Sequence, residues 1–424
     1  MAGGLGFEPR RTAPKTVVLP LDDPPAPRTL YFNPAIRYKL VASGPTRTRF
    51  QSRQPPYNGI NMGSNSQVRL SKLSESLSAA SIDVFLAWSP ISMGYLADFF
   101  EYGHERFLTL MVHRSGEVAL IAPSLSAAQA RRMGIQNVIP WSDGEKPLAH
   151  FEKVMREWGA TTLAIDPEMP AHMVLSIQNA LPGAKFVNGH SIISSLRAVK
   201  STDELEKMRA ASRIVDEVFP IACAAIKPGV SELEISDVLA SEMKKRGGTP
   251  TFSIVAAGAN AAEPHHLSDH SLIQANQVVL MDFGCELDHY QSDVTRTVCC
   301  GTASDELKHV YRTVHQAFLA GFAAVRPGVP PEDVDRAARS VIEAVGYGEA
   351  FFHRLGHGIG MQGHEEPNLV AGNTKPLEVG NCFSIEPGIY LEGNLGVRIE
   401  NLATVTADGV ESFNGMPPSE ILEI

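Results

Sequence analysis

The chain has 424 residues, of which 44% are hydrophobic and 20% charged, and its formal net charge is −10. This length allows two or three domains, and the composition is that of an ordinary globular protein. The acidic balance argues against a nucleic-acid-binding surface. No apolar run approaches the ~20 residues that span a bilayer. We therefore expect neither nucleic acid nor membrane among its partners.

The cysteines are odd in number and widely spaced in apolar sequence. This pattern predicts buried, reduced thiols, which are typical of a cytoplasmic protein. Two of them are adjacent, a spacing that fits neither a metal site nor a redox motif. The five are Cys223, Cys285, Cys299, Cys300 and Cys382.

Residues 1–61 differ in composition from the rest of the chain. They hold ten of the 29 prolines, with nine Lys or Arg against three Asp or Glu. No helical or strand period persists there, so the segment cannot bury enough apolar surface to fold. Two explanations stay open: a disordered tail, or an annotation extension that precedes a physiological start at Met62.

Helical and strand patterns alternate from Arg69 onward. This alternation predicts a compact α/β domain over residues 62–195. A hairpin turn is expected at residues 114–116, where Arg-Ser-Gly separates two strand runs. Helices are predicted at residues 70–80, 126–133 and 147–158, and strands at residues 83–88, 107–113, 118–122, 137–141 and 161–165.

A weak internal repeat marks residues 196–424. Ser201 and Glu204 fit a capping box that begins a long amphipathic helix. That helix is followed by Pro-Gly-Val at residues 228–230. A second such helix, over residues 307–325, is followed by Pro-Gly-Val at 327–329. The repeat agrees with a domain of two similar halves.

Five potential metal ligands lie in the last third of the chain. The four carboxylates occur in strand-like apolar sequence, where burial is costly unless they are paired or bind a metal. Carboxylates with one imidazole suit two divalent cations, which together activate water for hydrolysis. The five residues are Asp282, Asp293, His357, Glu386 and Glu400.

The segment 352–367, FHRLGHGIGMQGHEEP, resembles the signature of the pita-bread metallopeptidases, the superfamily of methionine aminopeptidase, aminopeptidase P and prolidase. Segments 282–297, 384–390 and 396–400 match in the same order. The resemblance is strong over residues 195–410 and weaker back to residue 65. It implies an α/β (α+β) protein, with a creatinase-like amino-terminal domain at 62–195 and a pita-bread catalytic domain of pseudo-two-fold halves at 196–424.

The resemblance also implies a role for each ligand. Asp282 would bind one metal, Asp293 and Glu400 would bridge two, and His357 and Glu386 would complete the second. Glu386 would also carry a proton from water to the leaving amine. A shell made mainly of carboxylates favours Mn²⁺, with Co²⁺ or Zn²⁺ as alternatives.

Further residues are implied to contact substrate. His265 and His364 match the family's substrate-binding histidines and would hold the scissile carbonyl or its oxyanion. His265 is preferred to the adjacent His266 because it directly follows Pro264, although the choice stays open. His353 is expected in the substrate pocket.

Arg398 shares a strand face with Glu400 two residues later. Its guanidinium is expected either to pair with a ligand carboxylate or to meet the carboxylate of the substrate. The family more often has Asp after the last glutamate, where this chain has Asn401.

These observations predict a dinuclear metallopeptidase, an Xaa-Pro dipeptidase or aminopeptidase that acts on dipeptides or short peptides. The sequence itself does not reveal the oligomeric state, and a homodimer is implied only by analogy with the family, whose members often form dimers. The alternatives are a metal-dependent non-peptidase enzyme such as a lyase, and a non-catalytic binding protein on the same fold. Five retained ligands argue against the binding protein. The peptidase-like Asp-Phe-Gly at 282–284 argues against the lyase.

Overall fold

The computed structural model describes residues 63–424, and the expectations for residues 1–61 and Met62 lie outside this range. No helix among the described residues is long and apolar enough to cross a membrane. All five cysteines lie in the described range and are free thiols. Four are buried as expected, while Cys223 is only partly buried.

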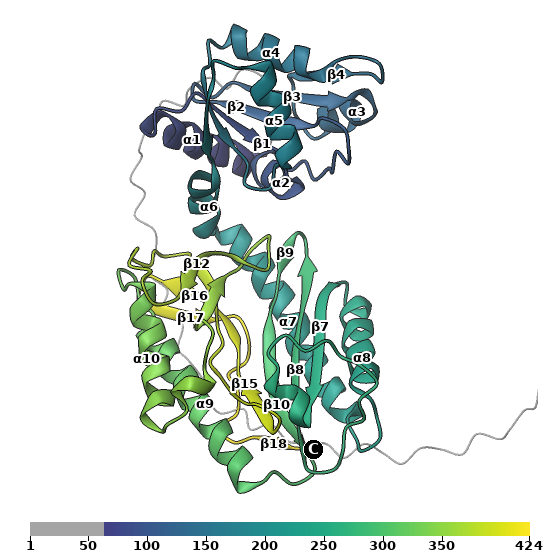
Figure 1. Ribbon diagram of the computed structural model, residues 1–424, viewed down its shortest axis with the longest axis vertical. Helices are drawn as coiled ribbons and strands as arrows, with labels where there is room; N and C mark the ends of the chain where they lie inside the picture. Colours follow the sequence, from purple (N-terminus) through teal and green to yellow (C-terminus); the bar gives the residue numbers. More distant parts are fainter. Residues whose placement is uncertain (1–62) are drawn as a thin grey trace, which may run out of the picture. The chain divides into compact units, whose positions relative to one another are not determined.

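The amino-terminal domain is built on a mixed sheet with strand order β4-β3-β2-β1-β5-β6 (Figure 1). The central strand β1 pairs antiparallel with β2 and parallel with β5. Each helix and strand predicted here from the sequence is present. The strands are β1 (Val84–Ala87), β2 (Thr109–His113), β3 (Val118–Pro123), β4 (Val138–Trp141), β5 (Thr162–Ile165) and β6 (Lys185–Asn188).

Helices cover both faces of this sheet. Leu70, Leu73 and Leu77 of α1 pack on one face, and Phe151 and Val154 of α4 pack on the other. Because both faces are covered, the strands read as continuous apolar runs rather than alternating ones. The helices are α1 (Ser64–Ala79), α2 (Pro90–Ala97), α3 (Ser124–Arg132), α4 (Pro147–Glu157), α5 (Ala171–Ala180) and α6 (His190–Ala198).

The sequence did not predict α2, α5, β6 or α6 of this domain. For α2, burial gives the reason. Six of its eight residues, 92–97, are buried. A helix that is enclosed on most sides carries no amphipathic period. Its start is nevertheless conventional, because Ser89 caps the helix through the amide of Ser92 and Pro90 is the first helical residue.

The carboxy-terminal domain has two similar halves, each made of two helices and a curved sheet (Figure 1). The predicted repeat corresponds to α7 and α9, and Ser201 with Glu204 forms the predicted capping box of α7. In the first half, β10, β8 and β7 are adjacent, with β18 at the edge. Its elements are α7 (Thr202–Ala225), α8 (Glu232–Lys245), β7 (Thr249–Ala257), η1 (Gly258–Ala262), β8 (Gln277–Leu287), β9 (Tyr290–Gln291), β10 (Val294–Cys300) and β18 (Leu422–Glu423).

The second half contains a five-stranded sheet in the order β12-β11-β13-β16-β17 and a separate β14-β15 hairpin. Its helices α9 and α10 pack against each other, as α7 and α8 do in the first half. The elements are α9 (Asp305–Ala324), α10 (Pro331–Ala344), η2 (Gly348–Ala350), β11 (Gly356–Gly358), β12 (Glu365–Leu369), β13 (Cys382–Ile385), β14 (Gly388–Leu391), β15 (Leu395–Arg398), β16 (Asn401–Thr406) and β17 (Gly409–Ser412).

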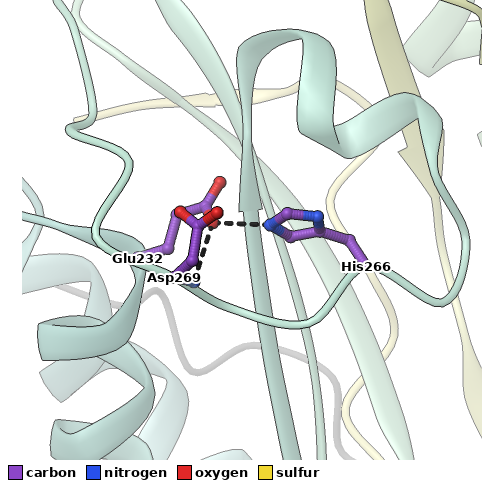
Figure 2. A group of neighbouring side chains, drawn as sticks. All are labelled: Glu232, His266 and Asp269. Carbon is purple, nitrogen blue, oxygen red and sulfur yellow. Dashed lines mark hydrogen bonds and ion pairs between the residues drawn. The ribbon is translucent and has the colours of Figure 1, made fainter.

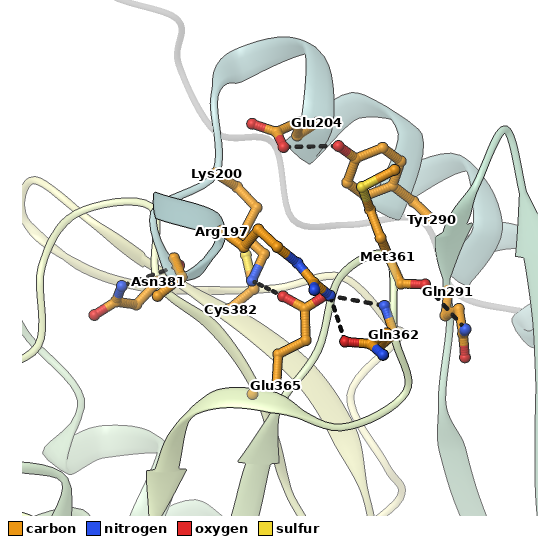
Figure 3. A network of polar contacts seen from close by, with 12 residues as sticks. Arg197, Lys200, Glu204, Tyr290, Gln291, Met361, Gln362, Glu365, Asn381 and Cys382 are labelled. Atoms are coloured by element: carbon orange, nitrogen blue, oxygen red, sulfur yellow. Dashed lines mark hydrogen bonds and ion pairs between the residues drawn. The ribbon is translucent and has the colours of Figure 1, made fainter. Parts of the chain in front are cut away.

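A buried ionic cluster ties α6 and the segment after it to the start of β12 (Figure 3). Glu365 Oε1 accepts from Arg197 Nη2 at 2.5 Å, and its Oε2 lies 3.4 Å from Lys200 Nζ. Burial alone would raise the pKa of Glu365. Lys200 and Arg197, with the amide of Gln362, more than offset that effect, so the pKa is lowered and the carboxylate stays ionised.

Glu365→Ala should destabilise the protein strongly, because it leaves two buried cations without their partner. We expect a loss of about 3–5 kcal/mol in the free energy of unfolding, measured by chemical denaturation. The matched control is Glu411→Ala, which removes the more exposed Arg209–Glu411 pair and should cost no more than about 1 kcal/mol. Equal losses for the two variants would contradict the importance of the buried cluster.

Candidate metal centre

One cavity of about 540 Å³ is lined by all five predicted ligand residues. Asp282 lies within β8 and Asp293 directly before β10, so both come from the first half of the domain. The other three come from the second half: His357 from β11, Glu386 directly after β13, and Glu400 directly before β16. The cavity therefore depends on the association of the two halves.

His357 presents an unprotonated nitrogen to the carboxylates. Its Nδ1 lies 3.1 Å from the carbonyl oxygen of Gly358 and donates to it, so Nε2 carries no proton in the neutral ring. Nε2 lies 3.7 Å from Asp293 Oδ2 and 3.5 Å from Glu386 Oε1. Burial lowers the pKa of His357 to about 3, which keeps the ring neutral and able to bind a cation.

Several carboxylate oxygens in the cavity lack any donor. Ligand atoms of Asp293, His357 and Glu400 all lie within 4.8 Å of one another. Asp282 Oδ1, Asp293 Oδ1 and Glu400 Oε1 are buried without a hydrogen-bond partner among the described residues. Buried oxygens of this kind require an explanation, and a bound cation supplies one.

The remaining oxygens are held by neighbouring side chains. Asp282 Oδ2 accepts from Arg398 Nη2 at 2.6 Å, and Glu400 Oε2 accepts from Thr295 Oγ1 at 2.6 Å. Each of these two carboxylates thus has one oxygen fixed by a donor and one free. Glu386 Oε1 is similarly fixed by Ser384 Oγ at 3.1 Å. Such contacts orient ligands before a metal binds.

Burial and mutual repulsion act together on these carboxyl groups. Burial, and then the charge of neighbouring carboxylates, raises the pKa values of Asp293 and Glu400 well above their usual range. Burial also raises the pKa of Glu386 to about 7, although Arg398 opposes the shift. So many buried carboxylates cannot all ionise near neutral pH without added positive charge. Divalent cations would provide that charge, so the residues fit a metal site.

Comparison with known proteins agrees with this chemistry. The profile of metallopeptidase family M24 matches residues 206–407, and that of the Creatinase/Prolidase N-terminal domain matches residues 69–199. An Xaa-Pro dipeptidase of Lactobacillus helveticus is 36% identical over 355 residues, which cover 82% of this chain and 96% of the relative. The chain belongs to metallopeptidase family M24.

Solved structures give the same result for the whole M24 architecture. The dipeptidase PepE from Mycobacterium ulcerans superposes with a TM-score of 0.80 at 33% identity, covering 84% of this chain and 97% of that one. A prolidase from Thermococcus sibiricus superposes with a TM-score of 0.80 at 34% identity, covering 85% and 100%. The creatinase-like domain and pita-bread domain predicted from the sequence are confirmed.

In this M24 site Arg398 pairs with a candidate ligand carboxylate, that of Asp282, which is one of the two contacts expected from the sequence. Besides Asp282, its guanidinium donates to Thr295 Oγ1 at 3.0 Å and to Tyr390 Oη at 2.9 Å. The side chain is 3% exposed. Its donors therefore bind Asp282 and the two side chains Thr295 and Tyr390, although Arg398 also lines the cavity.

The structure separates the predicted histidines by their partners. His265 and His364 both line the cavity, whereas His266 lies 2.7 Å from Glu232. His364 Nδ1 accepts from Arg354 Nη2 at 3.2 Å. Burial and then Arg354 lower the pKa of His364. The ring is therefore neutral, with its own proton on Nε2.

His353 lines the cavity, but both of its nitrogens are engaged. Nδ1 donates to the carbonyl oxygen of Arg354 at 2.7 Å, so Nε2 accepts from the hydroxyl of Tyr390 at 3.0 Å. Burial lowers its pKa to about 4. Any contact of this ring with substrate would therefore be through its carbon atoms, because Nδ1 is bonded to the Arg354 carbonyl oxygen and Nε2 to Tyr390.

Sequence reasoning missed several residues at this site. Arg354 lines the cavity and donates to Asn368 Oδ1 at 2.7 Å as well as to His364. Its place in the matching segment 352–367, beside His353, was the available sequence signal. Thr295, Ser384 and Tyr390 lie in the matching segments, but nothing in an apolar strand pattern distinguishes them as supports of the carboxylates.

Metal-free protein should lose stability as the pH rises from about 5 to 8. Carboxyl groups whose pKa is raised by folding stabilise the fold below their unfolded value, and this contribution is lost as the pH passes the folded value, about 7 for Glu386. Cations relieve the repulsion, so the gain in Tm on adding Mn²⁺ should be larger at pH 8 than at pH 5. Thermal denaturation of chelator-treated protein measures both.

The control is Glu386→Gln, which cannot titrate at this position. Its metal-free Tm should fall less over the same pH range than that of the unmodified protein. A metal-free Tm that rises from pH 5 to pH 8 would show that repulsion among the carboxylates does not control the stability of the metal-free protein.

Proposed function

We propose that this M24 protein hydrolyses the amino-terminal Xaa-Pro bond of dipeptides or short peptides with two divalent cations. The observation that carries the proposal is one cavity in which the carboxylate cluster and His357 adjoin His265 and His364. The names of its relatives, an Xaa-Pro dipeptidase and a prolidase, support the same substrate class. The chain spans nearly their full length.

The ligand roles follow the arrangement expected from the sequence. Asp282 would hold one cation, Asp293 and Glu400 would bridge both, and His357 and Glu386 would complete the second. We expect Mn²⁺, because oxygen ligands predominate. When bound, the pair of cations lowers the pKa of water and polarises the scissile carbonyl.

Protein groups manage the proton and the developing charge. Glu386 would accept a proton from the attacking water and pass it to the proline nitrogen as the carbon–nitrogen bond breaks. Ser384 holds this carboxylate in place. The Nε2–H of His364 and the ring of His265 would donate to the carbonyl oxygen as it gains negative charge.

Arg354 is the better candidate for the carboxylate of a dipeptide. Arg398 has its donors committed to Asp282, Thr295 and Tyr390, whereas Arg354 lines the cavity with its guanidinium anchored by Asn368. A planar guanidinium suits a carboxylate. A site with this cation prefers a free carboxyl terminus and therefore favours a dipeptidase over an aminopeptidase.

We further propose that the protein acts in the cytoplasm, because its five cysteines are free thiols. Assembly as a homodimer remains an expectation from the family resemblance.

Selectivity for proline tests the proposed function most directly. A proline ring can pack on the apolar cavity wall of Phe252, Ile254 and Phe352 and brings no amide N–H. A leucine would bury an N–H without a partner, which costs about 1–3 kcal/mol. We expect kcat/KM for Ala-Pro to exceed that for Ala-Leu by at least about tenfold with Mn²⁺-loaded enzyme. Equal values would contradict the Xaa-Pro assignment and leave only the metallopeptidase.

Arg354→Met tests the dipeptidase preference. Removing the cation should raise KM for Ala-Pro by about tenfold or more, while Ala-Pro amide, which has no carboxylate, should change far less. The matched control is Arg336→Met, an exposed arginine of α10, which should leave both substrates unaffected. Equal losses for the acid and the amide would show that Arg354 acts only through His364.

A further inference from the structure

The segment joining β7 to β8 carries two adjacent histidines with different surroundings. It begins with η1 and continues through Pro264 to residue 276. His265 lines the cavity. The ring of His266 points instead toward Glu232 at the start of α8, as Figure 2 shows. This second cluster has no part in the proposed reaction.

Glu232 is completely buried. The donors to its carboxylate come from Ala257, the last residue of β7, and from this segment. Its Oε1 accepts from the amide of Ala257 at 2.7 Å and from Asn260 Nδ2 at 2.9 Å. Its Oε2 accepts from His266 Nε2 at 2.7 Å and from the amide of Asp269 at 3.4 Å. The carboxylate therefore gathers four donors from residues 257–269, on both sides of His265.

Glu232, His266 and Asp269 lie close enough together to suggest a metal site. The hydrogen bonds argue otherwise. Both oxygens of Glu232 already accept from N–H groups, and His266 Nε2 must carry a proton to donate. A protonated nitrogen cannot bind a cation. The cluster is better explained as an anchor for the segment.

We propose that Glu232 and His266 are positioning residues that hold His265 at the cavity. A buried carboxylate is stable only while its oxygens have donors. Without His266, Oε2 would retain only the long contact with the amide of Asp269, and the segment would lose its attachment next to His265. The catalytic effect of misplacing His265 rests on the proposed function, but the anchoring of the segment by Glu232 and His266 does not.

The segment has a second attachment, which favours folding of the variants. The amides of Glu232 and Leu233 donate to the carbonyl oxygens of Ser271 and Asp269 at 3.1 and 3.0 Å. These backbone contacts do not involve the ring of His266. His266→Ala should therefore fold, with a local loss of order rather than a global one.

Activity measurements separate positioning from general stability. His266→Ala should lower kcat for Ala-Pro by about tenfold with unchanged metal content. His266→Gln should remain within about threefold of the unmodified enzyme, because its amide nitrogen can donate from a similar distance. His270→Ala, which alters an exposed histidine of the same segment, is the control and should have no effect.

A double-mutant cycle with His265→Ala decides whether His266 acts through its neighbour. If it does, His266→Ala should change kcat by less than about twofold once His265 is absent. Losses that multiply in the double variant would overturn the proposal, and so would normal activity of His266→Ala alone. Should His266→Ala not fold, the same cycle with Glu232→Gln replaces it under the same criteria.

Hydrogen exchange gives a readout independent of catalysis. The amides of Ala257 and Asp269, which donate to Glu232, should exchange at least about tenfold faster in His266→Ala than in His270→Ala. Unchanged exchange would overturn the anchoring. Unmodified enzyme that fails to cleave any Xaa-Pro peptide would refute the proposed function, while the exchange result would still decide whether Glu232 and His266 anchor the segment.

Discussion

Repulsion between buried carboxylates is the constraint on which the rest of the site depends. Four carboxyl groups from both halves of the domain enclose one cavity, and burial raises the pKa of three of them. One arginine, Arg398, is placed among them, and its donors hold only one oxygen of Asp282. Because this charge compensation is incomplete, binding of the proposed cations would also stabilise the fold.

His265 and His364, which both line the cavity, are attached to the fold in the same way. His265 is followed by His266, which donates to the buried Glu232. His364 is followed by Glu365, which is paired with buried cations (Figure 3). In each case a residue at the cavity is adjacent in sequence to a residue anchored in the interior. This arrangement restricts the backbone beside a functional ring without occupying the cavity.

The sequence by itself determined the α/β class, the two-halved catalytic domain and the five candidate ligands that all line the cavity. Local chemistry explains this success. Helix starts such as Ser201 with Glu204 depend on neighbouring residues. Carboxylates in apolar strands are too costly to bury without a reason, so their presence was informative before any contact was known.

Only the tertiary structure decided which partners the polar groups have. Arg398 and Asp282 are 116 residues apart in the chain, and the sequence left the arginine with two possible partners. His265 and His266 are adjacent and chemically identical, and the sequence left the choice between them open. The structure separates them, because His265 lines the cavity and His266 contacts Glu232. Helix α2 lacks a pattern because it is enclosed. In each case the deciding contacts are between residues distant in sequence, and local sequence patterns do not predict such contacts.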